Sequence, residues 1–377
     1  MIDFLTHPHH RYTQSFDWIE EAIGLPIRIL HGDEATLREY LPSLEKQPPK
    51  LLILFQLEHL AAWARCFCPV ILLPMYDLSR MTPDSYLAAL FGVEFISLSR
   101  TLHQRLSALG LSSRHLQYCP NPAKFPQVSW EEGVRAYFWE RTPTELDDRA
   151  VQGLLSGLGV ESLEVRRLGD AQFGQGQSAE ARGKAERSWQ NPQDYIRQLA
   201  NYNVYVAPRR FEGIGMTFLE AMAMGMCVVA ENQPTANEYI LSGQNGILYG
   251  GGRDHLFSPP HTSLSELERM GNAARESMGK IHRNWVETRG EINRCVKSLL
   301  ERPLIKRSPP ASLLEATFDF SRRPEKFWSL ASSISPRAEI WRSEKMEKRA
   351  HARRGWLGHL RWFFQNPRAY LKALIER

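Results

Sequence analysis

The segment VYVAPRRFEGIGMTFLEAMAMGMCVVA, residues 204–230, decides the architecture of this chain. Its first four residues are an apolar run that predicts a buried strand, which ends in a turn at Pro208. A loop with two glycines, Gly213 and Gly215, follows, and a helix and a second apolar strand come next. This order of strand, glycine loop, helix and strand is typical of parallel sheets.

The same alternation extends over most of the chain and predicts the α/β class, with parallel sheets covered by helices on both faces. Strands are expected at 51–55, 70–74, 93–97, 115–118, 134–139, 163–165, 204–207, 227–230 and 246–249. Helices are expected at 12–23, 101–108, 192–201 and 218–224, with long helices within 263–300.

A proline-rich stretch near residues 120–130 divides the chain. We expect one α/β domain at 1–125 and a second at 131–300 that includes the closing helices. Residues 301–377 are expected to form a linker and a basic tail, because 303–337 hold prolines, serines and arginines without clear periodicity. A length of 377 residues suits two domains.

Charge is distributed unevenly. Residues 341–377 hold ten Lys/Arg and three Asp/Glu, a net +7, whereas residues 1–340 carry −2. A basic tail on a nearly neutral body argues against a body that binds nucleic acid. The five cysteines fit neither a disulfide framework nor a zinc site, and no secretory signal or long apolar run stands out. We therefore expect buried, reduced thiols and a cytoplasmic protein.

The glycine loop and the helix after it have a specific chemistry. The first N–H groups of a helix and its dipole attract anions such as a diphosphate, and glycine lets a ligand approach the backbone. Glu212 in the loop can accept hydrogen bonds from sugar hydroxyls, and Glu220 in the helix can hold a ribose. The alternative is a solvated loop acid and a surface acid. A nicotinamide-binding fingerprint is absent here, because Gly213 and Gly215 lack the third glycine.

The segment EGIGMTFLEAMAMGMCVV resembles the retaining glycosyltransferases of the GT-B architecture, commonly called family 4. Their hallmark is Glu-x7-Glu within a segment like EGFG…LEAMACGLPVV. The likeness continues through residues 237–240 and 243–248. It extends more loosely to 95–99, to 118–122 and to Trp285, and it is absent after 305.

The resemblance implies two Rossmann-like domains facing a cleft, an acceptor-binding N-terminal domain and a donor-binding C-terminal domain. It implies transfer with retention from a nucleotide-sugar, without metal or other cofactor, to a glycan or lipid-linked acceptor of surface-polysaccharide assembly. Glu212 would contact the donor sugar, and Arg141 would bind the diphosphate. The other donor-binding candidates are Gly213, Ile214, Gly215, Met216, Thr217, Glu220 and Arg210.

This sequence departs from the family in one place. A lysine usually follows the arginine by about five residues, but residues 144–148 read Thr-Glu-Leu-Asp-Asp. Lys184, Arg209 and Arg210 are the candidates for the second cation, and the sequence does not choose among them. The alternative function is a catalytically silent sugar-nucleotide-binding protein of the same fold.

The acceptor side offers His10 and Asp77. His10 belongs to a histidine-rich loop, 7–10. The alternatives are polar residues that line the cleft, a simple surface loop and a metal site, although no carboxylate nearby completes a metal set. Asp77 falls where the family often has His-Asp near the acceptor, or it caps the next helix.

The tail has its own pattern. Within 353–377, Trp356, Leu360 and Phe363 fall at helical spacing beside several arginines. Aromatic anchors with cations suit an anionic membrane surface, and packing on a protein surface is the alternative. We expect an enzyme that is peripheral on the inner face of the membrane.

Overall fold

The computed structural model describes residues 1–8, 10, 16–140, 146–166, 192–250, 261–302 and 308–333. Within these residues the strands form two parallel sheets, as the apolar runs predicted. The chain divides into two compact units, 1–82 with 92–308 and 83–91 with 309–377. None of the described helices combines the length and the apolar character needed to cross a membrane.

The first sheet has the strand order β2-β1-β3-β4-β5-β6, and its pairings are parallel. The order reverses at β1, so the carboxyl ends of β1 and β3 flank the position where α/β sheets commonly bind ligands. The strands are β1 (Ile2–Thr6), β2 (Ile27–His31), β3 (Leu51–Phe55), β4 (Val70–Leu73), β5 (Glu94–Ser97) and β6 (Ser113–His115).

Helices connect these strands. The Asp33 side chain accepts a hydrogen bond from the Thr36 N–H, and Ser99 does the same for Leu102, so each residue caps the helix that follows it. The helical elements are α2 (Asp17–Ile23), α3 (Glu34–Ser43), η1 (Glu58–Leu60), α4 (Ala61–Ala64), α5 (Tyr76–Ser79), α7 (Arg100–Ala108) and η2 (Pro122–Lys124).

The second sheet has the order β11-β10-β9-β7-β8 and is also parallel. Its strands are β7 (Val134–Trp139), β8 (Val160–Arg166), β9 (Val204–Val206), β10 (Cys227–Glu231) and β11 (Ile247–Tyr249). Its helical elements are α8 (Asp148–Leu155), α10 (Pro192–Leu199), α11 (Met216–Ala223), η4 (Ala236–Glu238) and α12 (Leu264–Thr288). Both α11 and α12 pack against β10.

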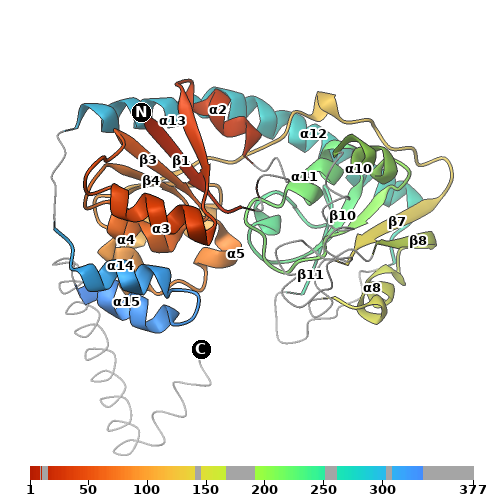
Figure 1. The fold of residues 1–377 in the computed structure, drawn as a ribbon. Helices are drawn as coiled ribbons and strands as arrows, with labels where there is room; N and C mark the ends of the chain where they lie inside the picture. Colours follow the sequence, from red (N-terminus) through yellow and green to blue (C-terminus); the bar gives the residue numbers. More distant parts are fainter. Residues whose placement is uncertain are drawn as a thin grey trace, which may run out of the picture. The chain divides into compact units, whose positions relative to one another are not determined.

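The last helix of the first unit, α13 (Gly290–Glu301), returns to the first sheet. It packs against α2 and β3 (Figure 1), and the Asn293 side-chain amide donates a hydrogen bond to the Ile23 carbonyl. Ile292 and Val296 are buried on this helix. A segment near residue 300 therefore completes the layer that covers the first sheet.

The second unit contains α6 (Asp84–Ala89), α14 (Ala311–Phe318) and α15 (Pro324–Ser333). Tyr86 and Phe327 are fully buried, with ring centroids 5.3 Å apart. The prediction of an irregular connection over 303–337 was wrong for residues 311–318 and 324–333, which are helical. Proline is favoured at the start of a helix; here Pro310 is the N-cap residue of α14, and Pro324 is the first residue of α15.

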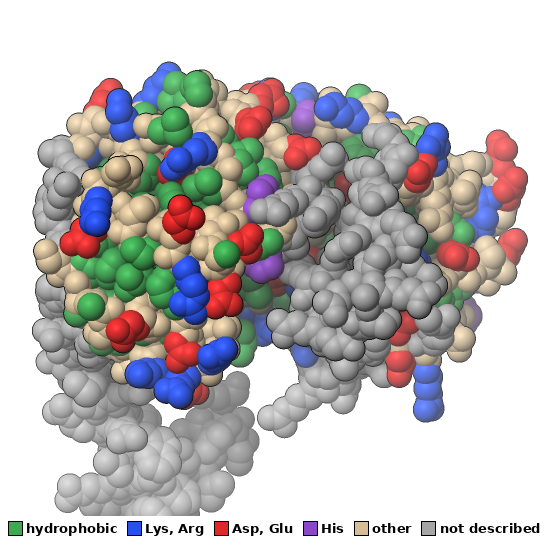
Figure 2. Space-filling view, in the orientation of Figure 1, with side chains coloured by type: hydrophobic (Ala, Val, Ile, Leu, Met, Phe, Trp, Pro, Cys, Tyr) green, Lys and Arg blue, Asp and Glu red, His purple; other side chains and the backbone are tan. Residues whose placement is uncertain are grey.

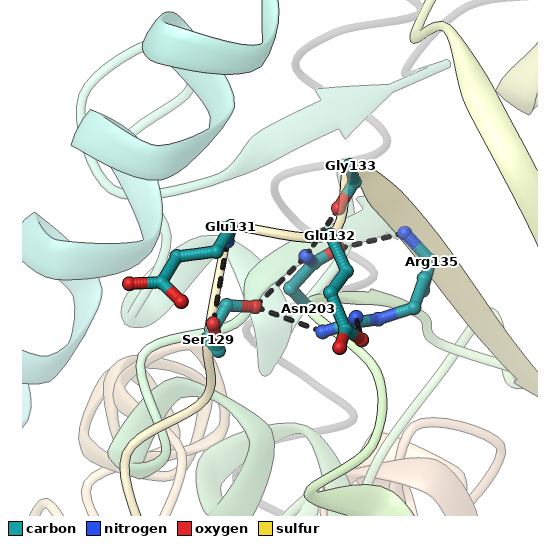
Figure 3. Close-up of polar contacts among 6 residues, drawn as sticks. All are labelled: Ser129, Glu131, Glu132, Gly133, Arg135 and Asn203. Atoms are coloured by element: carbon teal, nitrogen blue, oxygen red, sulfur yellow. Dashed lines mark hydrogen bonds and ion pairs between the residues drawn. The ribbon is translucent and has the colours of Figure 1, made fainter.

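Asn203 fixes the starts of two strands in the second sheet (Figure 3). Its buried side chain accepts a hydrogen bond from the Arg135 N–H at 2.8 Å. Its amide donates to the carbonyls of Ser129 at 3.1 Å and Gly133 at 2.8 Å. These bonds hold the turn before β7 to the residue before β9, at the amino-terminal edge of the sheet, so we assign Asn203 a structural role.

Replacement of Asn203 should destabilise the protein strongly. Asn203→Ala leaves a buried N–H and two carbonyls without these partners, and an unsatisfied buried group costs about 1–3 kcal/mol. We expect a loss of about 2–4 kcal/mol in the free energy of unfolding, measured by urea denaturation. Exposed Asn201 is the matched control, and Asn201→Ala should change stability by less than about 0.5 kcal/mol. Equal effects of the two substitutions would contradict this role.

Candidate active site

The junction between β9 and α11 contains most of the residues singled out from the sequence. The strand ends at Val206 and the helix begins at Met216, so the loop leaves the carboxyl end of a central strand. Gly215 precedes the helix at φ +77°, a left-handed conformation. A Cβ at this position would lie 1.9 Å from Phe218 Cε1, so the aromatic ring occupies the space of a side chain.

The start of α11 suits an anion. Gly215 has no side chain to cap the helix, so the N–H groups of the first turn have no side-chain acceptor from the N-cap residue. Free N–H groups at a helix N-terminus carry partial positive charge. Ile214 and Thr217 are buried beside this turn, and Met216 is half-buried. The local backbone therefore has the arrangement that the sequence predicted.

Glu212 lies in this loop and is almost fully buried. Its Oε2 atom lies 3.5 Å from Arg209 Nη1. A second carboxylate reaches the same guanidinium, because Arg209 Nη2 donates to Asp77 Oδ2 at 3.0 Å. Asp77 follows β4 in the first turn of α5. The structure thus joins a donor-side candidate to an acceptor-side candidate through Arg209.

Arg210, the next residue of the loop, contacts a different carboxylate from those that Arg209 contacts. Its Nε lies 2.8 Å from Glu231 Oε1, and its guanidinium lies 5.3 Å from the ring centroid of Phe211. Both arginines of the loop therefore contact carboxylates of the protein itself. The other cationic candidates, Arg141 and Lys184, lie outside the described residues, so the second cation stays a prediction.

Glu220 lies in the second turn of α11 and is half-buried. Burial raises the pKa of this carboxyl group to about 8. Within the described part of the chain, the Glu220 carboxylate forms no hydrogen bond or ion pair. A desolvated carboxylate of this kind is typical of a residue that binds a ligand.

His10 lies after β1, and Gln56 directly follows β3. His10 Nε2 lies 2.8 Å from Gln56 Oε1, and burial lowers the pKa of the imidazole to about 4, so the ring is neutral near pH 7. Gln56 adopts φ +60°, which costs a non-glycine residue about 1–2 kcal/mol. Such backbone outliers are enriched at functional sites. Gln56 is thus a candidate that we did not select from the sequence, although a polar residue directly after an apolar strand was a usable signal.

The structure places His10 with Gln56 and Asp77 with Arg209. Figure 2 shows histidine and charged side chains of both signs on the viewed face around the position of α5. Among the described residues, no group of three or more His, Cys, Asp or Glu side chains is arranged to hold a metal ion. All five cysteines are buried.

Glu238 lies in η4, which follows β10 of the second sheet, and it binds the start of α7, which follows β5 of the first sheet. Its carboxylate accepts hydrogen bonds from the Ser99 hydroxyl at 2.9 Å and from the N–H groups of Arg100 and Thr101 at 2.6 and 3.0 Å. These N–H groups belong to the first turn of α7, where a negative charge is favourable. The stretch 237–240, which continues the main likeness, therefore meets the looser stretch 95–99 in space.

Residues 148–257 match a family model described as glycosyl transferases group 1. The chain is a glycosyltransferase. Solved structures of this enzyme class share its fold. HepE from Anabaena, in complex with UDP and glucose, is 12% identical and has a TM-score of 0.51, over 79% of this chain and 98% of that one. A sucrose-phosphate synthase from Thermosynechococcus elongatus is 11% identical with a TM-score of 0.52, over 79% and 99%.

These identities are low, so the likeness to the two solved structures establishes the fold alone. That fold is GT-B, with two parallel sheets and their helices. No curated protein matches the sequence of this glycosyltransferase. The family match begins at α8 and ends after β11, so it includes the Glu212 loop and all of α11.

Substitution of Gly215 should perturb this glycosyltransferase more than substitution of an equivalent glycine elsewhere. Gly243 has φ +76° but open space where a Cβ would lie, whereas Gly215 faces the Phe218 ring. We expect Gly243→Ala to lower the free energy of unfolding by about 1–2 kcal/mol through backbone strain alone. Gly215→Ala should cost about 1–3 kcal/mol more because the ring and loop must shift. Urea denaturation of both variants checks this, and equal losses would show that the contact is unimportant.

Proposed function

We propose that this glycosyltransferase transfers a sugar from a nucleotide-sugar donor, with retention, to a glycan or lipid-linked acceptor in cell-surface polysaccharide assembly. The observation that carries the proposal is the β9–α11 junction, where an uncapped helix start lies between the buried Glu212 and the desolvated Glu220. HepE was solved with UDP and with UDP-glucose, which supports a uridine nucleotide as the first donor to test.

Each acid has a separate task in this proposal. Glu212 accepts a hydrogen bond from a hydroxyl of the donor sugar, and Glu220 accepts from the two ribose hydroxyls. Gly213, Ile214, Gly215, Met216 and Thr217 surround the diphosphate with backbone, and Arg141 and Arg210 add positive charge. A carboxylate that accepts from sugar hydroxyls gains more than a neutral acceptor would, because charge-assisted hydrogen bonds are stronger.

The chemical step needs little covalent participation by the protein. The acceptor oxygen bonds to the anomeric carbon as the bond to the leaving phosphate oxygen breaks. That phosphate oxygen takes the acceptor proton on the same face, which retains the configuration. The protein's contribution is to stabilise the charge that grows on the diphosphate. The start of α11 and Arg141 are proposed to do this, without a metal ion.

His10 and Asp77 are proposed to lie on the acceptor side. His10 is held by Gln56 at the switch point of the first sheet, where α/β sheets bind ligands. The neutral imidazole suits a hydroxyl group of the acceptor. We also propose that the enzyme works in the cytoplasm and that residues 353–377, which lie outside the described residues, bind an anionic membrane surface.

A second function has one observation in its favour. Arg209 and Arg210 both contact protein carboxylates, and residues 144–148 lack the family's lysine. A chain without a second cation would bind a nucleotide-sugar without cleaving it. Binding without donor hydrolysis, even at high enzyme concentration, would favour this silent binding protein.

The first test is a screen of donor hydrolysis. We expect the full chain to release a nucleoside diphosphate from at least one common nucleotide-sugar, beginning with UDP-glucose, and to remain active in EDTA. The freed sugar should first appear by NMR as the same anomer as in the donor. Initial formation of the opposite anomer would exclude retention, and activity restored only by a divalent ion would exclude the metal-free route.

The second test uses the pKa of Glu220. UDP should bind more tightly as the pH rises through about 8, because the ionised carboxylate is the better acceptor for ribose hydroxyls. Titration calorimetry between pH 7 and 9 avoids the last diphosphate ionisation, which lies near pH 6. At pH 9, Glu220→Gln should bind UDP about ten- to a hundredfold more weakly, and its affinity should not rise across this range.

Exposed Glu268 on α12 provides the matched control, and Glu268→Gln should bind UDP as the parent does. The raised pKa of Glu220 affects folding stability in the opposite direction: as the pH rises, UDP binding should strengthen, whereas the stability of the free protein should fall. The folded state holds the proton more tightly than the unfolded state, so its contribution is lost as pH rises from about 4.5 to 8. A parent protein whose UDP affinity is flat from pH 7 to 9 would remove Glu220 from the ribose site.

A further inference from the structure

Two loops of this glycosyltransferase contact each other at Gly213. A Cβ on Gly213 would lie 3.0 Å from both Asp77 Oδ1 and Met75 Cβ, a tight contact that would require these side chains to shift slightly. One is the loop after β9, which contains Glu212; the other is the segment after β4, which passes through Met75 into the first turn of α5, where Asp77 lies. A polar link between them is therefore a link between the proposed donor and acceptor sides.

Arg209 provides that link with two different nitrogens. Nη2 contacts Asp77 at 3.0 Å and Nη1 contacts Glu212 at 3.5 Å. The side chains are only 15%, 10% and 7% exposed for Arg209, Asp77 and Glu212. Arginine suits this position, because its planar fork can bind two carboxylates and keeps its charge when buried.

The Asp77 loop is itself held to the first sheet. Glu58, just after β3, is buried, and its carboxylate accepts a hydrogen bond from the Ser79 hydroxyl at 2.6 Å. Burial raises the pKa of Glu58, and the nearby charge of Asp77 adds to the effect. The position of Asp77 is therefore fixed by α5 and by Glu58.

We propose that Arg209 is a positioning residue for Glu212 and that Asp77 acts through Arg209. The guanidinium keeps the buried Glu212 carboxylate ionised and oriented for the donor sugar, and Asp77 holds the guanidinium in place. The role assigned to Glu212 rests on the proposed function; the electrostatic arrangement does not. The chain thus uses Arg209 to organise its own acid rather than to bind the diphosphate directly.

Substitution of Arg209 and substitution of Asp77 should shift the pKa of Glu212 in opposite directions. Arg209 is a cation beside a buried carboxylate, and removal of such a cation raises the pKa of the acid by roughly 1–3 pH units. Asp77 is a second anion that shares the same guanidinium. Asp77→Asn should lower the pKa of Glu212, because a like charge near Glu212 is removed while the amide oxygen can still accept a hydrogen bond from Arg209. A purely structural role would not produce shifts of opposite sign.

The experiment measures the Glu212 carboxyl directly. The full chain is labelled with 13C at the glutamate carboxyl carbons, Glu212→Gln assigns the signal, and NMR follows its titration. We expect Arg209→Gln to raise the pKa by about 1 pH unit or more and Asp77→Asn to lower it. Arg209→Lys, which keeps the charge, should restore most of the ionisation and guards against a folding defect. Exposed Arg197, paired with Asp194, is the control, and Arg197→Gln should leave the titration unchanged.

Activity and binding complete the test. Hydrolysis of UDP-glucose should fall about a hundredfold in Arg209→Gln and about tenfold in Asp77→Asn, while the Kd for UDP changes less than threefold. In the double variant, Asp77→Asn should add less than twofold to Arg209→Gln, because Asp77 acts through Arg209.

Three results would overturn the inference. They are an unchanged Glu212 titration in Arg209→Gln, shifts of the same sign in both variants, or a large loss of UDP affinity, which would make Arg209 a diphosphate ligand. A parent protein that neither binds UDP nor hydrolyses UDP-glucose would count against the proposed uridine donor instead, and the NMR titration would still test the ion pairs.

Discussion

The conformation of Gly215 is the constraint on which the other parts of the site depend. At φ +77°, with the Phe218 ring where a side chain would be, the backbone turns sharply from the loop into α11. This turn leaves the first N–H groups of the helix without a side-chain cap and places Glu212 in the preceding loop. It also brings Gly213 against Asp77. A single backbone geometry thus sets the anion-binding helix start and the contact between two loops.

The two acids on either side of this turn lie in different electrostatic surroundings. Glu212 is the more deeply buried, yet a guanidinium lies beside it. Glu220 is only half-buried but lacks an ion pair among the described residues, and desolvation raises its pKa to about 8. Paired carboxylates in contrasting environments commonly have separate roles. The charge of Glu212, which Arg209 balances, suits a carboxylate held in a fixed orientation. The charge of Glu220, without an ion pair among the described residues, suits a carboxylate that binds and releases a ligand.

Local structure was predictable where the apolar runs were long and buried, as for β3 and β7, whose bounds match the expected 51–55 and 134–139. Strand β2 was not identified, because it is an edge strand whose residues are mostly half-exposed. The Glu212 loop could be identified from its glycines and acids. Its partner Asp77 was selected for another reason, and no pattern in the sequence pairs Arg209 with a residue 132 positions away. Such pairings are set by the meeting of loops from different strands.

The return of α13 to the first sheet has a consequence for synthesis of the chain. A ribosome releases β1 first, but the helix that covers α2 and β3 emerges only after residue 301. Domains generally fold as units during translation, yet here the second sheet and α12 are complete in the chain before the first sheet has its last helix. The domain of the first sheet is therefore the first to begin synthesis and the last to be completed. A fragment that ends at residue 125 would leave the apolar face of α2 uncovered, so residues 290–302 should be among the segments that it needs for solubility.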